Sequence, residues 1–219
     1  MALIQILPSA LSDQIAAGEV VERPSSVAKE LLENALDAGA TRITVDFELG
    51  GVKRLRIVDN GEGMTVEDAV LSVRRHATSK IANLDDLNNI GTLGFRGEAL
   101  ASIASVSRFR VRTKQKGDLA ATLVNVEGGA EPTVSETGGP VGTEVVVEDL
   151  FFNVPARRKF LKKKETESTH IVETAQRLAL CYPTVAFKVI RDGKPVLDLP
   201  VHSDLNERLR GLFPKSITS

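Results

Sequence analysis

The pattern of apolar and polar positions predicts helices and strands of ordinary length along most of the chain. Between residues 24 and 39, apolar side chains recur every three or four positions, which is the period of an amphipathic helix. Pro24 and Ser25 are typical of a helix start and Gly39 of a helix end. Residues 41–49 then alternate between apolar and polar, as a strand does. A Gly50–Gly51 turn and a second strand over residues 52–63 complete a predicted β-hairpin.

The rest of the chain continues in both patterns. Helices are expected over residues 65–77, 98–106, 165–182 and 205–213, with Thr65 as an N-cap and Asp68 at the reciprocal capping position. Strands are expected over residues 108–113, 119–127, 132–136 and 142–150, and a hairpin over residues 185–199 around Asp192–Gly193. Residues 77–97 show little periodicity and are predicted to be a mobile loop. Tight turns between neighbouring strands indicate an α+β fold with a mixed, mostly antiparallel sheet and helices on one face.

Composition narrows the classes of function. The chain has 219 residues and 42% hydrophobic content, enough for one core over residues 1–202 and the start of a second domain over residues 203–219. Lys and Arg total 28 against 29 for Asp and Glu, so any nucleic-acid binding must come from a local patch. A single cysteine, Cys181, excludes an internal disulfide and fits a reducing compartment. No apolar run could span a bilayer and no export signal is evident, so we expect a cytoplasmic protein.

The first long helix carries two polar residues at the edge of its apolar stripe. Glu30 and Asn34 are one turn apart and lie on one strip of the helix, whereas Lys29 and Glu33 are expected on the opposite side, in water. Taken alone, the pair is typical of a solvated glutamate and a tolerated asparagine. A carboxylate and an amide one turn apart could also act together on one ligand.

A second candidate is Asp59, which lies within the predicted second strand. Leu55, Ile57 and Asp59 share one parity, so if the first two face the core the carboxylate does as well. A buried carboxylate needs a hydrogen-bond donor, either from the protein or from the exocyclic amine of a bound base. Gly61 and Gly63 would let the backbone turn and approach a ligand closely. The alternative is an ordinary turn that begins with Asp.

Two further segments could contact a ligand. Residues 91–100, "GTLGFRGEAL", lead from a glycine-rich loop into a helix expected to begin near Arg96, whose free N–H groups would suit a phosphate. The alternative is a plain flexible loop, and the spacing matches neither a Rossmann nor a Walker motif. Thr143 begins a predicted strand and could place its hydroxyl in a pocket.

In this order, the four segments resemble the GHKL ATPase family, which has the two-layer Bergerat sandwich. The segments "QIAAGEVVERP", "ENALDAGA", "DNGEGM", "HATSKI", "GFRGEALASI" and "LFFNVPARRKFL" are similar to the N-terminal region of bacterial MutL mismatch-repair proteins. The resemblance runs from about Ile6 to the end of the chain. It implies that residues 1–202 are a GHKL ATPase domain and that residues 203–219 begin the transducer domain.

The resemblance also implies roles for individual residues. Glu30 would be the general base for ATP hydrolysis, Asn34 would hold Mg²⁺, and Asp59 would accept the adenine amino group. The remaining positions are expected close to the nucleotide: Gly63 and Thr143 near the base, and Thr78, Ser79, Lys80, Gly94, Phe95, Arg96, Gly97, Glu98, Ala99 and Leu100 near the phosphates. In the family a lysine from the following domain completes the site, so these 219 residues are expected to bind ATP but to hydrolyse it weakly.

The partners implied by the resemblance are a MutS-type mismatch-recognition protein, DNA bound without sequence specificity, and a second copy of the chain when ATP is bound. Without nucleotide we expect a monomer. Residues 157–164 are a candidate DNA contact with six cations in eight positions, against the alternative of a solvated basic loop or a surface for a protein. The six are Arg157, Arg158, Lys159, Lys162, Lys163 and Lys164.

Two other functions stay open on the sequence. The chain could be another GHKL enzyme. A kinase would need a helix with an acceptor histidine, and none of the three histidines of the chain has that context. A topoisomerase subunit would need a cleavage domain, which these 219 residues are not expected to contain. It could also be a scaffold that binds nucleotide without turnover, against which Glu30 argues.

Overall fold

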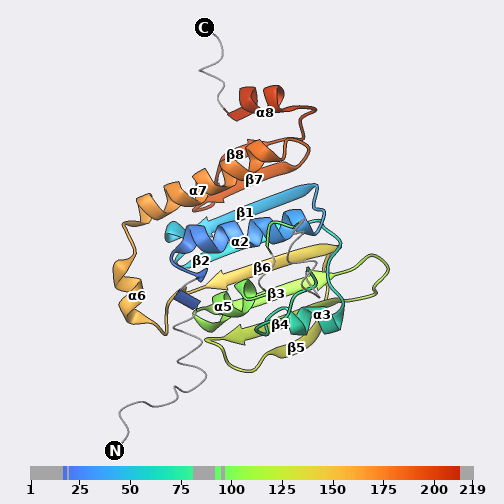
Figure 1. The fold of residues 1–219 in the computed structure, drawn as a ribbon, viewed down its shortest axis with the longest axis vertical. Helices are drawn as coiled ribbons and strands as arrows, with labels where there is room; N and C mark the ends of the chain where they lie inside the picture. The colour runs from blue at the N-terminus through green and yellow to red at the C-terminus, as the bar shows by residue number, and fades with distance from the viewer. Residues whose placement is uncertain (1–16, 19, 81–91, 95–96, 213–219) are drawn as a thin grey trace, which may run out of the picture.

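The computed structural model describes residues 17–18, 20–80, 92–94 and 97–212. One layer is an eight-stranded sheet with the order β5-β4-β3-β6-β2-β1-β7-β8. Helices α2, α5 and α7 lie over one face of this sheet (Figure 1). The strands are β1 (Arg42–Glu48), β2 (Arg54–Asp59), β3 (Arg108–Lys114), β4 (Ala121–Glu127), β5 (Thr133–Thr137), β6 (Gly142–Glu148), β7 (Ala186–Arg191) and β8 (Lys194–Leu199). The predicted α+β fold is confirmed.

All neighbouring strands are antiparallel except β1 and β7, which are parallel. The β1–β2 hairpin forms as predicted, and Ile43, Val45 and Phe47 are buried on one side of β1. The alternation stops one residue earlier than expected. Leu49 is exposed and begins a short 3₁₀ turn, η1 (Leu49–Gly51), because two successive glycines with positive φ let the chain reverse there.

The second layer is dominated by two long helices, α2 (Pro24–Asp37) and α7 (Lys164–Cys181), which pack against each other. The predicted apolar stripe of α2 is buried, including Val27, Leu31 and Leu32. The prediction for Glu33 was wrong, because this residue was expected in water but is only 7% exposed. Its carboxylate accepts a hydrogen bond of 2.7 Å from Lys29 Nζ, so the neighbouring cation compensates the charge at the edge of the core.

The shorter helices are α3 (Val66–Leu71), α5 (Ala99–Ser105) and α6 (Pro155–Phe160). The N-cap of α3 is confirmed, because Thr65 Oγ1 accepts from the Asp68 backbone N–H at 3.0 Å. This helix is nevertheless much shorter than the predicted 65–77 segment. In α6 the structure has a short helix where a basic loop had been one of the expectations.

The last helix, α8 (Leu205–Leu212), packs against α7 and β8 and is not isolated. It is held by Arg208, which is fully buried and donates from Nη2 to the carbonyl oxygens of Pro183 at 2.6 Å and Val185 at 2.5 Å. These carbonyls follow the C-terminal end of α7, where a cation is favoured by the helix dipole. The predicted domain boundary at residue 202 stays a prediction.

Within the described part of the chain, none of the helices is both long enough and apolar enough to cross a bilayer.

Candidate functional site

Three segments that the sequence marked separately meet at the C-terminal end of α2. The turn after β2 contacts this end directly, since the Glu62 N–H donates to the Ala38 carbonyl at 3.0 Å. A Cβ added to Gly61 would lie 2.6 Å from the same carbonyl oxygen. On the other side, the N–H groups of Leu93 and Gly94 donate to Asp37 at 3.0 and 3.3 Å. The helix end therefore joins the Asp59 turn to the glycine-rich segment.

Asp59 lies at the end of β2 with the parity that the sequence predicted, following the buried Leu55 and Ile57. Its Oδ1 accepts from the backbone N–H of Gly61 at 2.8 Å and of Thr143 at 3.2 Å. Burial raises the pKa of this carboxyl above its usual 3.8, and the two backbone hydrogen bonds partly offset the effect. Both bonds fall on Oδ1, so Oδ2 is the oxygen that could accept from a ligand.

Two threonine hydroxyls adjoin this carboxylate. Thr143 Oγ1 lies 3.0 Å from Thr113 Oγ1, which also accepts from the Met64 N–H at 2.8 Å. The pair joins β3 and β6 to the turn after β2 beside Asp59. Thr113, which is 1% exposed, was missed from the sequence, although a threonine at a core-facing position of β3 was a signal that could have found it.

The turn after β2 requires glycine because the backbone of β3 approaches it. Gly63 has φ +74°, and a Cβ there would lie 2.1 Å from the Lys114 carbonyl oxygen. The sequence predicted a close approach at Gly63, but to a ligand. The structure shows that at least one side of this glycine is occupied by the protein's own backbone.

A second group of polar side chains surrounds the last turn of α2. Lys80 Nζ donates to Asn34 Oδ1 at 3.0 Å and to Asp37 Oδ2 at 2.5 Å. A Cβ on Gly94 would lie 3.4 Å from Lys80 Nζ and 3.9 Å from Asn34 Oδ1, so the glycine-rich segment closes over this pair. The structure thus brings together Asn34, Lys80 and Gly94, which came from three separate motifs.

Asp37 is a site residue that the sequence reasoning missed. It lies three residues after Asn34, so the two share one face of the last helical turn. Its side chain is 10% exposed and accepts hydrogen bonds from Lys80, Leu93 and Gly94. The signal was available, because a carboxylate one turn beyond a candidate amide belongs to the same strip.

The other predicted residues are placed as follows. Glu30 is half-buried on α2 one turn before Asn34, with Oε1 3.8 Å from Lys29 Nζ. Thr78 Oγ1 accepts from the Lys80 N–H at 3.1 Å, and Ser79 is exposed. Gly97 has φ +63° and packs against Ala77.

The predicted helix near Arg96 begins later, at Ala99, with Leu100 second and Glu98 as its N-cap. Glu98 Oε1 lies 3.1 Å from His76 Nδ1, and its side chain makes no capping hydrogen bond to the helix. Phe95 and Arg96 lie outside the described residues.

The residues around Asn34 fit a metal that is carried by a ligand better than a metal held by protein alone. Among the described residues, no three His, Cys, Asp or Glu side chains come together as a metal site. Asn34 Oδ1 already faces a cation, the Lys80 ammonium, so its environment suits positive charge. Mg²⁺ commonly takes one or two protein oxygens and completes its shell with phosphates and water.

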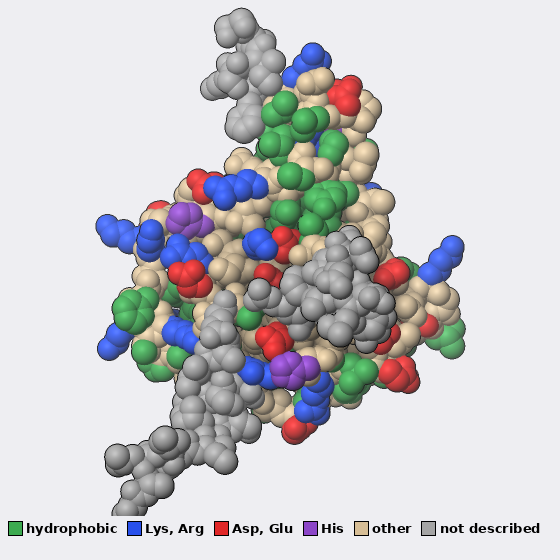
Figure 2. All heavy atoms as spheres, in the orientation of Figure 1, with side chains coloured by type: hydrophobic (Ala, Val, Ile, Leu, Met, Phe, Trp, Pro, Cys, Tyr) green, Lys and Arg blue, Asp and Glu red, His purple; other side chains and the backbone are tan. Residues whose placement is uncertain are grey.

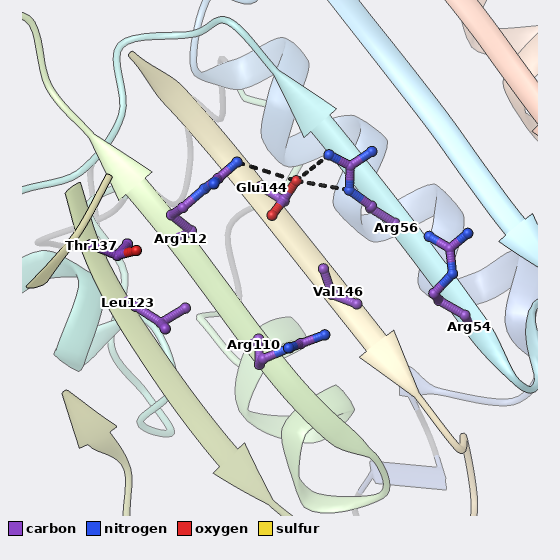
Figure 3. Close-up of a pocket in the computed structure, with 8 residues that line it drawn as sticks. All are labelled: Arg54, Arg56, Arg110, Arg112, Leu123, Thr137, Glu144 and Val146. Carbon is purple, nitrogen blue, oxygen red and sulfur yellow. Dashed lines mark hydrogen bonds and ion pairs between the residues drawn. The ribbon is translucent and has the colours of Figure 1, made fainter. Parts of the chain in front are cut away.

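The opposite face of the sheet, over which none of the described helices lies (Figure 3), carries a depression of about 260 Å³ that is lined largely by arginines and is remote from these residues. Figure 3 shows the Glu144 carboxylate between Arg56 and Arg112, with which it is paired. Arg54 is paired with Asp46 and Glu48 in the same way. Because these cations are neutralised by carboxylates within the sheet, the depression is not a free anion site.

The basic segment lies on α6 and the beginning of α7. Figure 2 shows Lys and Arg side chains gathered on this side of the molecule, at the left of the view. The segment has five exposed members: Arg158, Lys159, Lys162, Lys163 and Lys164. Arg157 differs, because its guanidinium lies against Gly18, where an added Cβ would be 1.8 Å from Nη2. Arg157 therefore packs against Gly18 and is less exposed than the others.

Comparison with known proteins places the chain and its fold in one family. Residues 22–135 match the family model described as "Histidine kinase-, DNA gyrase B-, and HSP90-like ATPase". The solved structure of the Aquifex aeolicus MutL ATPase domain complexed with ADP is 36% identical, with a TM-score of 0.71 over 89% of this chain and 70% of that chain. The chain belongs to the histidine kinase-, DNA gyrase B- and HSP90-like ATPase family.

Within that family, the sequence is similar to MutL DNA mismatch repair proteins. It is 54% identical over 208 residues to the protein of Syntrophobacter fumaroxidans, covering 95% of this chain and 31% of the relative. It is 52% identical over 213 residues to that of Opitutus terrae, covering 97% of this chain and 34% of the relative. The chain therefore spans about a third of the length of these relatives.

Proposed function

We propose that this chain is the ATP-binding and ATP-hydrolysing domain of a MutL-type DNA mismatch repair protein. The observation that carries the proposal is the meeting of three segments at the end of α2, where Asp59 lies on one side and Asn34, Asp37 and Lys80 on the other. A solved MutL ATPase domain of the same fold is complexed with ADP, which supports a nucleotide as the ligand.

The adenine would bind beside Asp59. Two backbone N–H groups hold Oδ1 and fix the carboxylate, which leaves Oδ2 to accept from the exocyclic amine of the base. Guanine presents an oxygen at that position, so its approach would set two acceptors against each other. Burial raises the pKa of Asp59 because its ionised form has lost hydrogen bonds to water. A hydrogen bond from the adenine amine would replace one of these and stabilise the ionised carboxylate. Thr143 and Gly63 would line the region next to the base.

The phosphates would bind near the end of α2 and the segment that contains Gly94. Lys80 supplies a cation, and the first residues of α5 supply backbone N–H groups without a side-chain cap. Asn34 would give one oxygen to a Mg²⁺ ion, which supplies charge neutralisation on the phosphates. Glu30, one turn earlier on the same helix, would orient and deprotonate the attacking water.

The same family resemblance supports weak turnover by these 219 residues. A lysine from a following domain completes the family's site, and α8 would be the connection to that domain. In the longer protein, ATP binding would favour a dimeric state through its higher affinity for that state. That switch would coordinate a MutS-type mismatch-recognition partner and DNA with the later steps of repair.

Calorimetric titration with ADP and with a non-hydrolysable ATP analogue, with and without Mg²⁺, tests the nucleotide site. We expect wild type to bind both, and Asp59→Asn to bind about tenfold to a hundredfold more weakly, because an amide sets its own donor against the adenine amine. A guanine nucleotide should bind more weakly than the adenine one. Equal affinity of wild type and Asp59→Asn for the ATP analogue would exclude this base site.

Turnover separates an ATPase from a scaffold that only binds nucleotide. Glu30→Ala should retain binding of the analogue and lose hydrolysis, measured in a chain extended through the following domain. Hydrolysis by Glu30→Ala at the wild-type rate would remove the assigned role of the carboxylate.

A further inference from the structure

The Asp37 carboxylate accepts hydrogen bonds from a group of donors of the kind that commonly binds a phosphate. Its carboxylate accepts from the Lys80 ammonium at 2.5 Å and from the consecutive backbone N–H groups of Leu93 and Gly94 at 3.0 and 3.3 Å. A lysine together with backbone N–H groups of a glycine-containing segment is a common arrangement for phosphate binding. Here a carboxylate of the protein's own helix takes those bonds.

The same contact occupies the candidate metal ligand. Lys80 Nζ bonds Asn34 Oδ1 at 3.0 Å while it bonds Asp37, so one cation connects the amide with the carboxylate. The ion pair is largely shielded from water, since the side chains of Lys80 and Asp37 are 19% and 10% exposed. Little solvent screening is therefore expected, and releasing the lysine needs another anion in its place.

We propose that Asp37 is a positioning residue that competes with the nucleotide phosphates for Lys80 and for the N–H groups of Leu93 and Gly94. This inference rests on the proposed ATP site. In the nucleotide-free protein, Asp37 keeps the donors assembled and holds Lys80 against Asn34. When the phosphates take these donors, Lys80 leaves Asn34 and the amide oxygen becomes available. The apparent affinity for nucleotide is then lower than the intrinsic affinity, because the internal contact must first be given up.

The competition predicts the sign of a mutation. Asp37→Asn keeps the shape of the side chain but removes its charge, so it weakens the internal contact. ADP should bind this variant threefold to tenfold more tightly than wild type when measured by calorimetry in EDTA. If Asp37 instead supported the bound nucleotide, the same substitution would weaken ADP binding, and that result would overturn the proposal.

Glu33→Gln is the matched control. It removes one negative charge from the same helix one turn earlier, and Glu33 is bonded to Lys29 and not to Lys80. A general relief of repulsion between α2 and the phosphates would tighten ADP binding in both variants, whereas competition by Asp37 tightens it only in Asp37→Asn. Equal tightening in the two variants would contradict the proposal.

A second readout needs no nucleotide. Amide hydrogen exchange at Leu93 and Gly94 in the ligand-free protein should be about tenfold faster in Asp37→Asn than in wild type and unchanged in Glu33→Gln. Unchanged exchange in Asp37→Asn would show that the carboxylate does not hold this segment, even if ADP binds. Failure of wild type to bind ADP would instead remove the proposed ATP site, and the competition with it, whatever the exchange rates. Asp37→Ser, which keeps a small acceptor, should change both readouts in the same direction and checks that the amide has introduced no new contact.

Discussion

The Asp59 carboxyl is destabilised in its ionised form by burial, whereas the proposed contact with adenine needs that ionised form. Burial raises its pKa, which means that the folded protein binds this proton more strongly than the unfolded chain does. Its contribution to stability is therefore fully present below the unfolded-state pKa of about 3.8 and is lost as pH rises through the higher folded-state value. A ligand that donates to the ionised carboxylate would compensate for this loss, so the ligand-free fold tolerates a charge that the proposed adenine site would use.

Asp59→Asn should accordingly stabilise the ligand-free protein at pH 7, and the gain over wild type should shrink as pH falls toward 4. The amide oxygen can still accept from Gly61 and Thr143, so the turn keeps its hydrogen bonds. Urea unfolding followed by circular dichroism between pH 4.5 and 8 measures the difference, since the chain has no Trp for fluorescence. Asp198→Asn, at an exposed position of β8, is the comparison and should show no such pH-dependent gain. A larger gain for Asp59→Asn at pH 4.5 than at pH 8 would contradict the assigned sign.

The residues that the sequence placed correctly are those whose position follows from local pattern. Strand parity predicted the inward direction of Asp59, and helix spacing predicted the strip that holds Glu30 and Asn34. The position of Asp37 on the same strip as Asn34 was evident from helix spacing, but its hydrogen bonds were not, because Lys80 and Gly94 lie more than 40 positions later in the chain. Glu33 was misplaced because helix spacing alone does not show that Lys29 compensates its charge at a buried edge.

Among the elements, the turn between β2 and α3 is the one whose shape depends most clearly on a single residue. Gly63→Ala should destabilise the fold by about 3–5 kcal/mol, because the backbone has positive φ and the new Cβ would overlap the Lys114 carbonyl oxygen. Gly39→Ala measures the cost of the positive φ alone, without the steric overlap. Gly39 has a similar φ of +70°, but a Cβ added there would meet no atom within 4 Å, so this change should cost only about 1–2 kcal/mol. Equal losses in chemical denaturation would show that β3 can move away from the turn.

The attachment of α8 depends on a buried arginine. Arg208→Ala would leave the carbonyls of Pro183 and Val185 without their donor, at a cost of about 2 kcal/mol. Because α8 is the last described element, the change should release this helix locally and not unfold the domain. Amide exchange in α8 should become roughly 30-fold faster, while exchange in α2 stays unchanged. Arg210→Ala, at an exposed position of the same helix, should leave both rates as in wild type.

The types of the longer elements were predictable because each depends on its own sequence. The described strands and the helices α2 and α7 correspond to segments that apolar periodicity and turn residues predicted. The parallel pairing of β1 with β7 was not predicted, since these strands are separated by more than 130 residues and their pairing belongs to the tertiary fold, in which α2 also packs against α7. The shortening of α3 and the late start of α5 likewise reflect tertiary context, which overrides local helix propensity.

Over the whole molecule, charge is distributed unequally between the two sides of the fold. On the face of the sheet opposite the described helices, arginines are paired with carboxylates: Arg54 with Asp46 and Glu48, Arg56 and Arg112 with Glu144, Arg110 with Glu148, and Arg108 with Glu127 and Asp149. Such a face has little net charge to attract a polyanion. The exposed cations of α6 and of the start of α7 have fewer acidic neighbours, which makes them the better candidate for DNA despite the balanced charge of the chain.

Charge reversal on α6 tests this candidate at the scale of the molecule. Arg158→Glu with Lys159→Glu should weaken retention of duplex DNA at least tenfold at low salt and reduce the slope of log affinity against log salt, because two phosphate contacts are lost. Both residues are exposed, whereas Arg157 packs against Gly18, so its reversal would also disturb the fold. Lys116→Glu with Lys194→Glu changes the net charge by the same amount at exposed positions on other elements and should have a much smaller effect. If both double variants lose affinity equally, DNA responds only to total charge and α6 is not a contact. If neither loses affinity, the basic segment faces a protein or solvent and is not a DNA contact.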